Sequence, residues 1–265
     1  EKVRVVAAVD RELEHLENLV RRRVEARFQH LAASGAGRFI DARVPRDAST
    51  GALSNPVVRS AGVANASDLA LSGDGSSLFV ASRSGDTVTV LATANILANA
   101  VQTISGAAID GASSLALAAG AGGAENLYVT GHDGNSITVF QRAAGGTVFT
   151  QQQRLVNGQG GVSGLAGASG VRTTPDGQYV LVTSETGNQI GVFKRVADGS
   201  LQFVQRLAND AGGVSGLLAP VGLVVSADGA RVYVASQGVP GVSGGVVLLD
   251  NLALGGAPAA PVNLI

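Results

Sequence analysis

The candidate nucleophile of the chain is Ser243, in the stretch GVSGG from Gly241 to Gly245. The stretch fits G-x-S-x-G, a pattern in which hydrolases expose a serine at a sharp strand-to-helix turn, close to a histidine and an acid. Here the serine falls in an insertion rich in Pro and Gly between two apolar segments, and no helix pattern follows it. We therefore interpret Ser243 as a residue of a flexible loop, without a catalytic role.

Histidine and acidic side chains offer a second kind of chemistry. His15, His30 and His132 are scattered along the chain and match no recognised metal-binding spacing. His132 and Asp133, in the turn GHDGN, could form an acid–base pair, and Asp133 and Asn135 could ligate calcium. The further acids of a calcium loop are absent, so the sequence favours a solvated hairpin turn. It predicts no catalytic residue, no metal site and no cofactor.

Two glycine-rich stretches resemble each other, GQGGVSGLAGA at residues 158–168 and DAGGVSGLLAP at residues 210–220. Such loops bind phosphate when they open a helix and are followed by Lys-Ser or Lys-Thr, and neither stretch does so. Their recurrence indicates tight turns between successive structural units. Asp68 and Asp110 lie near the same kind of crossing, and we expect them to cap these turns by bonding backbone amides.

Composition excludes several classes of protein. The 265 residues carry 19 basic and 20 acidic side chains, so no nucleic-acid partner is expected. There is no Cys, which excludes disulfides and thiolate metal sites. The apolar runs reach about half of the roughly 20 residues that a transmembrane helix needs. The compartment is not fixed by the sequence, and we favour the periplasm or the cell surface over the cytoplasm.

One short apolar block occurs four times, and it must position any site. The blocks are LFVAS at 78–82, LYVTG at 127–131, VLVTS at 180–184 and VYVAS at 232–236, at steps of 49, 53 and 52 residues. A second apolar segment follows each block: VTVL from Val88, ITVF from Ile137, IGVF from Ile190 and, delayed by an insertion around Pro240, VVLL from Val246.

Asp-Gly precedes three of the blocks, at residues 74–75, 176–177 and 228–229. Between apolar runs this pair is a strong hairpin signal, because tight turns need a positive φ. A further strand precedes each turn and a fourth ends each unit, most clearly in SLQFVQRL at residues 200–207. Four strands in about 40–50 residues are typical of a β-propeller blade. The alternative, a linear β-solenoid, has shorter parallel coils and does not need these hairpins.

The blocks LYVTG and VYVAS, and the longer phrase TPDGQYVLVTSETGNQIGVFKRVADGSLQFVQ, resemble bacterial β-propeller repeat proteins of the YVTN type. This group includes lactonase-like seven-bladed propellers. The resemblance covers about residues 38–265 and implies an all-β propeller fold. It implies no single activity, since propellers serve as enzymes, binding modules and scaffolds, and it carries over no site residue.

The predicted architecture is about four complete four-stranded blades plus a partial first blade that carries a helical insertion. Residues 1–9 supply a strand of the partial blade, residues 10–35 the insertion and residues 36–265 the propeller blades. Residues 38–58 read as the third and fourth strands of the partial blade. With one strand missing from five blades, either an unrecognised strand closes a five-bladed ring or the chain is a segment of a larger propeller. We favour the segment, because the chain starts in mid-blade at Glu1.

The insertion reads as an amphipathic helix. Val9, Leu13, Leu16, Val20, Val24, Phe28 and Leu31 recur at helical spacing and form one apolar stripe. Because such a stripe must be buried on something, we predict that helix 10–34 docks a partner. The predicted partner-binding residues are Leu13, Leu16, Val20, Val24 and Phe28, with the basic cluster Arg21, Arg22 and Arg23.

The function favoured by the sequence is therefore a non-enzymatic interaction or structural module of a larger bacterial assembly. Its partner would be another protein or other parts of a larger chain. The first alternative is a lactonase-like hydrolase that uses acidic and His residues of the rim or channel. The second is a surface glycan-binding propeller, which the low aromatic content, 4% of the residues, disfavours.

Overall fold

The computed structural model describes residues 41–43, 47, 49–53, 57–59, 63, 65–250 and 262–264. The chain divides into two compact units, Glu1–Asn65 and Ala66–Ile265. In the first unit, β1 (Asp41–Arg43) pairs antiparallel with β2 (Val57–Arg59). That these two strands belong to the predicted partial blade stays a prediction. The other strand of that blade, the helical insertion and all eight predicted partner-binding residues lie outside the described residues.

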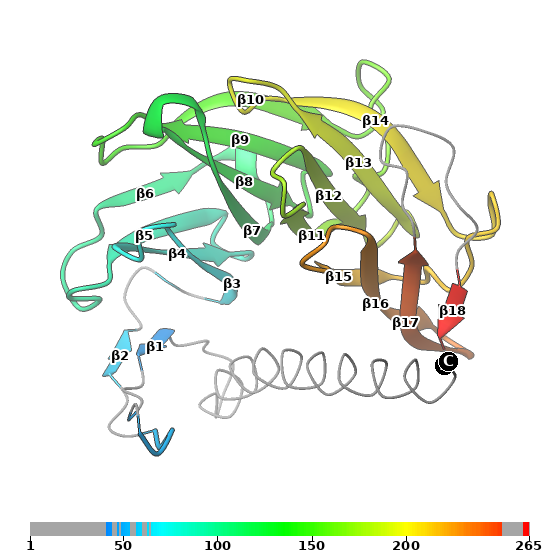
Figure 1. Ribbon diagram of the computed structural model, residues 1–265, viewed down its shortest axis with the longest axis horizontal. Coiled ribbons are helices and arrows are strands. Elements are labelled where there is room, and N and C mark those ends of the chain that lie inside the picture. Colours follow the sequence, from blue (N-terminus) through cyan, green and yellow to red (C-terminus); the bar gives the residue numbers. More distant parts are fainter. Residues whose placement is uncertain are drawn as a thin grey trace, which may run out of the picture. The chain divides into compact units, whose positions relative to one another are not determined.

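The second unit consists of four antiparallel sheets of four strands each, as the sequence predicts for propeller blades (Figure 1). Blade 1 holds β3 (Ala66–Leu71), β4 (Ser77–Ser82), β5 (Thr87–Ala92) and β6 (Gln102–Ser105). Blade 2 holds β7 (Ala112–Ala119), β8 (Glu125–Gly131), β9 (Ser136–Arg142) and β10 (Thr150–Val156). Blade 3 holds β11 (Ala168–Thr173), β12 (Tyr179–Ser184), β13 (Gln189–Arg195) and β14 (Leu201–Ala208). Blade 4 holds β15 (Pro220–Val225), β16 (Arg231–Val239), β17 (Val242–Asp250) and β18 (Val262–Leu264). Two short 3-10 helices, Ala107–Ile109 and Ala121–Gly123, flank β7.

The first strand of each blade lies beside the first strand of the next, in the order β3, β7, β11 and β15, and the fourth strands lie on the outside (Figure 1). The apolar core is built between neighbouring blades. At the junction of blades 1 and 2, for example, Phe79 meets Phe149 edge to face, with ring centroids 5.3 Å apart. Burial of each large apolar side chain of this kind contributes about 1.5–3 kcal/mol, so the blades stabilise one another.

The chain order gives each blade two different ends. The hairpins between first and second strands, and between third and fourth strands, lie at one end. The hairpins between second and third strands share the other end with the crossings from blade to blade. We call these the Asp-Gly end and the crossing end. At the Asp-Gly end, Gly75, Gly177 and Gly229 have φ values of 71°, 68° and 74°, which confirms the predicted turns.

Serine hydroxyls join successive blades near the crossing end. Ser67 Oγ donates to the carbonyl of Ala112 at 2.8 Å. Ser113 Oγ donates in the same way to Ala168 O at 2.7 Å, and Ser169 Oγ donates to Pro220 O at 2.8 Å. The three junctions therefore contain equivalent serine–carbonyl hydrogen bonds at equivalent positions, and these bonds fix the register of each blade against the next.

Glutamine amides join the outer strands of successive blades. Gln102 Nε2 donates to Phe149 O at 2.8 Å, and its Oε1 accepts from Phe149 N at 2.8 Å. Gln153 holds Leu201 in the same two-bond arrangement, at 2.9 Å and 2.7 Å. Gln205 occupies the corresponding position of β14, but among the described residues its buried Nε2 has no hydrogen-bond partner. We call each two-bond arrangement a glutamine clasp.

The structure corrects the interpretation of Ser243 as a loop residue. β17 begins at Val242, and Ser243 pairs with Gly238 of β16. The insertion around Pro240 is therefore an extension of the β16–β17 hairpin, because its residues continue the ladder between the two strands. The glycine-rich stretches do form turns at the crossings into β11 and β15, as predicted. In the described part of the chain, no helix has the length and apolarity to cross a membrane.

Candidate functional site

Charged side chains from three successive blades meet at the crossing end. Arg83 follows β4, His132 follows β8 and Glu185 follows β12, so each is the first residue after the repeated block. The main chains of His132 and Glu185 are held alike, because His132 N donates to Gly111 O and Glu185 N donates to Gly167 O, both at 2.9 Å. The repeat therefore places three different side chains at one position of three neighbouring blades.

His132 lies at the centre of this group. Its Nε2 is 3.3 Å from Glu185 Oε2, and its Nδ1 is 2.7 Å from Asp133 Oδ1. Arg83 Nη2 lies 2.6 Å from His132 Nδ1 and 3.0 Å from Asp133 Oδ1. The side chain of His132 is only 12% exposed, whereas Arg83 and Asp133 are 43% and 52% exposed. The predicted hairpin turn is present between β8 and β9, with Asp133 exposed to solvent, whereas the side chain of His132 is largely covered.

These contacts are compatible with two hydrogen-bonding arrangements of the His132 ring. With both nitrogens protonated, Nδ1 donates to Asp133 and Nε2 donates to Glu185. With the proton on Nε2 alone, Nδ1 accepts from Arg83, which also donates to Asp133. The hydrogen bond with His132, assisted by Arg83, lowers the pKa of Asp133 below its ordinary value. Asp133 is therefore ionised near neutral pH and can stabilise the charged ring.

A second polar group lies on the inner strands. Asp68 Oδ2 accepts from Ser114 Oγ at 2.6 Å and from the amide of Leu115 at 3.0 Å, and Arg172 Nη1 lies 3.8 Å from the same oxygen. Asp68 therefore bonds a backbone amide, as the sequence predicts, but at a strand of the next blade and not in a turn. Asp110 contributes its carbonyl, which accepts from Gly134 N at 3.0 Å. Both aspartates serve the junction of blades.

The calcium ligands considered from the sequence do not form a site. Asn135 Oδ1 accepts from the amide of Gly167 at 2.8 Å, so it joins blades 2 and 3. Within the described residues, no group of three or more His, Asp or Glu side chains could hold a metal ion. Ser243 pairs in its hairpin with Gly238, and Gln237, at the base of that hairpin, takes the position of His132 in blade 4.

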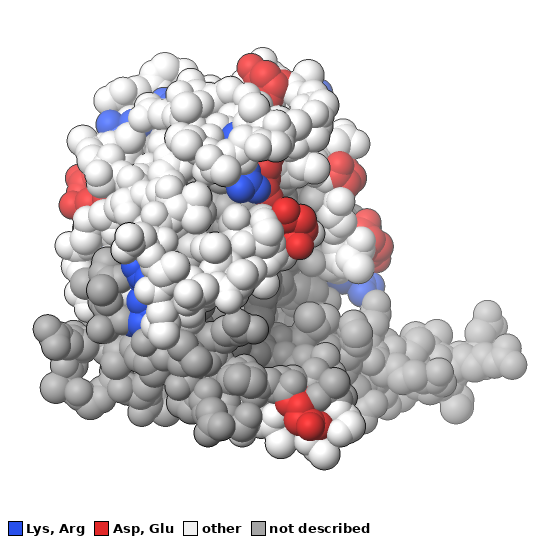
Figure 2. Space-filling model, turned by 90° about the vertical axis from the view of Figure 1, so that its left-hand side faces the viewer, with Lys and Arg blue, Asp and Glu red and all other residues white. Residues whose placement is uncertain are grey.

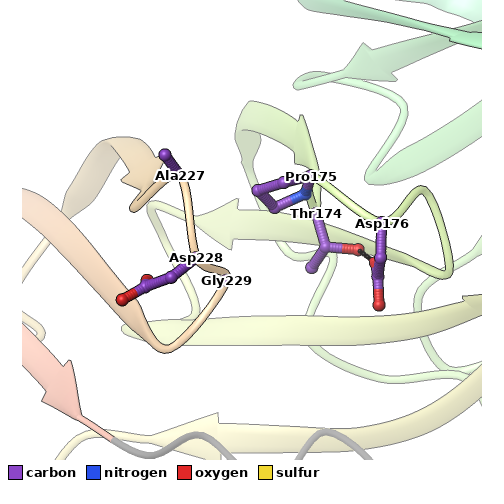
Figure 3. A pocket seen from close by; sticks show the side chains of 6 residues that line it. All are labelled: Thr174, Pro175, Asp176, Ala227, Asp228 and Gly229. Atoms are coloured by element: carbon purple, nitrogen blue, oxygen red, sulfur yellow. Dashed lines mark hydrogen bonds between the residues drawn. The ribbon is translucent and has the colours of Figure 1, made fainter.

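A hollow of about 380 Å³ lies at the Asp-Gly end, between the first hairpins of blades 3 and 4. It is lined by Thr174, Pro175, Asp176, Ala227, Asp228 and Gly229 (Figure 3). The two carboxylates point in different directions, and each accepts from a hydroxyl of its own turn, Thr174 or Ser226, at 2.5 Å. These hydrogen bonds lower the pKa of both aspartates. The carboxylates thus stabilise their turns, and we assign the hollow no ligand.

Charge is sparse over the face that Figure 2 shows, where Lys, Arg, Asp and Glu stand in small separate groups among uncharged residues. The described part of that face carries no broad basic surface of the kind that binds nucleic acid.

The comparisons with known proteins agree with this architecture. The model of the family described as "Lactonase, 7-bladed beta-propeller" matches residues 122–243. This chain is a β-propeller, and less than half of it matches the lactonase model. The matched segment contains His132, Asp133 and Glu185, whereas Arg83 precedes it. No curated protein matches the sequence.

Several solved structures share the propeller fold of this chain. The periplasmic gluconolactonase of Pseudomonas aeruginosa is 22% identical, with a TM-score of 0.65 over 85% of this chain and 63% of its own. A candidate 6-phosphogluconolactonase from Bacteroides uniformis is 18% identical, with a TM-score of 0.61 over 81% and 61%. Kuenenia stuttgartiensis hydrazine synthase is 20% identical, with a TM-score of 0.54 over 70% and 46%. At these identities the likeness concerns the fold, and the chain spans less than two thirds of each structure.

Sequence reasoning weighed His132 and Asp133 but missed Arg83 and Glu185. A signal for both was present, since Arg83, His132 and Glu185 each directly follow one of the repeated blocks. An alignment of the blocks extended by one residue places Arg83, His132, Glu185 and Gln237 in one column. We call these four positions the turn column.

Proposed function

We propose that this propeller hydrolyses a lactone, with the substrate bound over the turn column at the crossing end. The observation that carries the proposal is the position of His132 between Glu185 of blade 3 and the Arg83–Asp133 pair. His132, Asp133 and Glu185 lie in the segment that matches the lactonase model. The gluconolactonase fold of the Pseudomonas structure supports a sugar lactone as the substrate class, and its periplasmic location agrees with the compartment that we favour. The scaffold function that the sequence favoured depended on helix 10–34, which lies outside the described residues.

Each residue of the cluster has a role in lactone hydrolysis. Arg83 turns its exposed guanidinium from His132 to the substrate carbonyl, where it stabilises the oxyanion that forms when water attacks. This movement frees His132 Nδ1, which takes the proton of the attacking water. Glu185 fixes the ring through Nε2, as the acid does in a catalytic triad.

The second half of the reaction returns the proton. The tetrahedral intermediate collapses, the ring C–O bond breaks, and His132 Nδ1–H donates its proton to the departing alkoxide. The product is the open hydroxy acid, and the histidine is again neutral. Asp133, which accepts from Nδ1 in the charged state, stabilises the imidazolium between the two halves. None of these steps requires a metal ion.

The test is the hydrolysis of glucono-δ-lactone by the purified chain, followed by base uptake at constant pH and corrected for the spontaneous reaction. We expect His132→Gln and Glu185→Gln each to lower kcat/KM by about 100-fold or more, the usual contribution of a general base. Gln237→Ala is the matched control, because Gln237 occupies the same column in blade 4, and it should retain the rate. EDTA should leave the rate unchanged.

The proposal fails if the chain does not accelerate hydrolysis of glucono-δ-lactone or of simple γ- and δ-lactones. It also fails if His132→Gln or Glu185→Gln is as active as Gln237→Ala.

A further inference from the structure

Gly111 forms hydrogen bonds with two turns of the candidate site, the turn that carries Arg83 and the turn that carries His132. It precedes β7 at the crossing from blade 1 to blade 2, with a φ of +68°. Its amide donates to Asp86 Oδ1, in the turn between β4 and β5 of blade 1, at 2.7 Å. Its carbonyl accepts from the amide of His132 at 2.9 Å. Gly111 therefore ties the turn that carries Arg83 to the turn that carries His132.

The absence of a side chain at Gly111 creates the space that Asp133 occupies. A Cβ built on Gly111 would lie 2.6 Å from Asp133 N, 2.7 Å from Asp133 Cγ and 2.8 Å from Asp133 Oδ2. Cβ atoms in proteins essentially never approach other heavy atoms this closely. Two of the three atoms belong to the carboxylate that contacts His132 and Arg83. A methyl group at position 111 would therefore displace Asp133, its main-chain nitrogen as well as that carboxylate.

Blade 4 shows that the backbone conformation alone does not demand glycine at a crossing. Ala219 takes the place of Gly111 there, with a φ of +48°. Its amide donates to Asn188 Oδ1 at 2.8 Å, and its carbonyl accepts from Gln237 N at 3.1 Å. A methyl group is thus compatible with the left-handed backbone and with both hydrogen bonds. The residue after Gln237 is Gly238, so no side chain follows the turn column in this blade.

Blade 3 repeats the arrangement of blade 2. Gly167 donates to Asn135 Oδ1, its carbonyl accepts from Glu185 N, and a Cβ on it would lie 2.7 Å from Thr186 Oγ1. In blades 2 and 3 a side chain on the crossing residue would therefore meet the residue that follows the turn column. Blade 1 differs, since its crossing residue is Asn65, with a φ of 53°. In blade 4, a Cβ on Gly238 would meet Val242 and Gly244 of its own hairpin.

We propose that Gly111 is a positioning residue of the candidate site, which holds the Asp133 carboxylate against His132 and Arg83 by leaving it room. The catalytic consequence rests on the proposed lactone hydrolysis, since Asp133 stabilises the imidazolium in that reaction. The geometric consequence is independent of it. The two are therefore measured separately.

The geometric experiment is a ¹H–¹⁵N spectrum of the histidine rings in the full chain. The chain has three histidines, so His132→Gln assigns the signal of His132. We expect Gly111→Ala to shift the Nδ1 signal of His132 in the same direction as Asp133→Asn, because both remove the carboxylate contact. Gly167→Ala is the matched control: it introduces the same methyl group at the same kind of crossing, but against Thr186, and should leave that Nδ1 signal in place.

The catalytic experiment uses the same variants. Gly111→Ala should lower kcat for lactone hydrolysis about tenfold with little change in KM, because only the charged intermediate loses its partner. If Gly111→Ala does not fold, the double variant Gly111→Ala with Asp133→Gly should be more stable, since it removes the obstructed carboxylate.

The inference is overturned if Gly111→Ala retains the wild-type Nδ1 signal, or if the double variant is no more stable than the single one. A wild-type chain without lactone hydrolysis, but with the expected Nδ1 shift in Gly111→Ala, would instead refute the proposed function and leave the positioning role supported.

Discussion

Replacement of Gln153 by Leu should destabilise the propeller by breaking one glutamine clasp. Leucine keeps most of the volume of glutamine but leaves the amide and the carbonyl of Leu201 without the two hydrogen bonds of 2.7 Å and 2.9 Å. Leu201 is only 2% exposed, so water cannot replace them. A buried polar group left unpaired costs about 1–3 kcal/mol. Two such groups imply a loss of about 2–4 kcal/mol, given partial relaxation at the junction.

The assay is urea unfolding followed by far-UV circular dichroism, because the chain has no Trp and only three Tyr. In a domain of this size, about 2–4 kcal/mol also corresponds to a fall of roughly 4–16 °C in Tm. The chain supplies its own comparisons. Gln102→Leu breaks the same clasp at Phe149 and should cost a similar free energy of unfolding.

Gln205→Leu is the decisive control. Gln205 stands at the same position of β14, but its buried Nε2 has no partner among the described residues. Removal of an amide that has no partner within the described residues should leave the free energy of unfolding unchanged within about 0.5 kcal/mol, or raise it. Equal losses in Gln205→Leu and Gln153→Leu would refute the reasoning, since the loss would then come from packing of the side chain and not from the clasp.

Three further predictions concern other parts of the propeller. Arg195→Leu should lower the free energy of unfolding by about 2–4 kcal/mol in the same urea assay, because Arg195 donates to Tyr128 OH at 2.6 Å and to backbone carbonyls of two blades. Hydrogen bonds from Ser72 and Ser76 lower the pKa of Asp74 from 3.8 to about 2. A depressed folded pKa adds stability above the unfolded value that is lost as the pH falls from about 4 to 2, so Asp74→Asn should show a smaller fall of Tm over that range. Ser243→Ala should retain full lactone hydrolysis in the constant-pH assay, because Ser243 is a hairpin residue and not a nucleophile.

The repeat made the fold predictable, because the same residue types form the same turns and strands in successive blades. The Asp-Gly turns and the alternation of the blocks locate the strands to within a residue or two. The polar junctions were less visible, since Ser113 and Gln153 bond carbonyls and amides about 50 positions away. Only the angle between blades brings those groups together, and no local pattern encodes that angle.

The candidate site was hidden for the same reason. His132 and Asp133 are neighbours in the sequence, and their pairing could be considered from the turn alone. Arg83 and Glu185 lie 49 and 53 residues from His132, in hairpins that the packing of blades places side by side. Charged residues in hairpin turns are usually solvated, so their types alone gave no reason to join them.

The turn column can vary from Arg to His, Glu and Gln because the fold does not depend on its side chains. At His132, Glu185 and Gln237 the main-chain amide donates to the carbonyl of the crossing residue, whatever the side chain. His132→Gln should therefore lower Tm by only about 2–4 °C, the equivalent of roughly 1 kcal/mol, while it abolishes lactone hydrolysis. Calorimetry beside the activity assay separates the two effects. A variant that unfolds at a much lower temperature would show that the contacts of His132 hold blades 1, 2 and 3 together, and that its burial serves stability instead of chemistry.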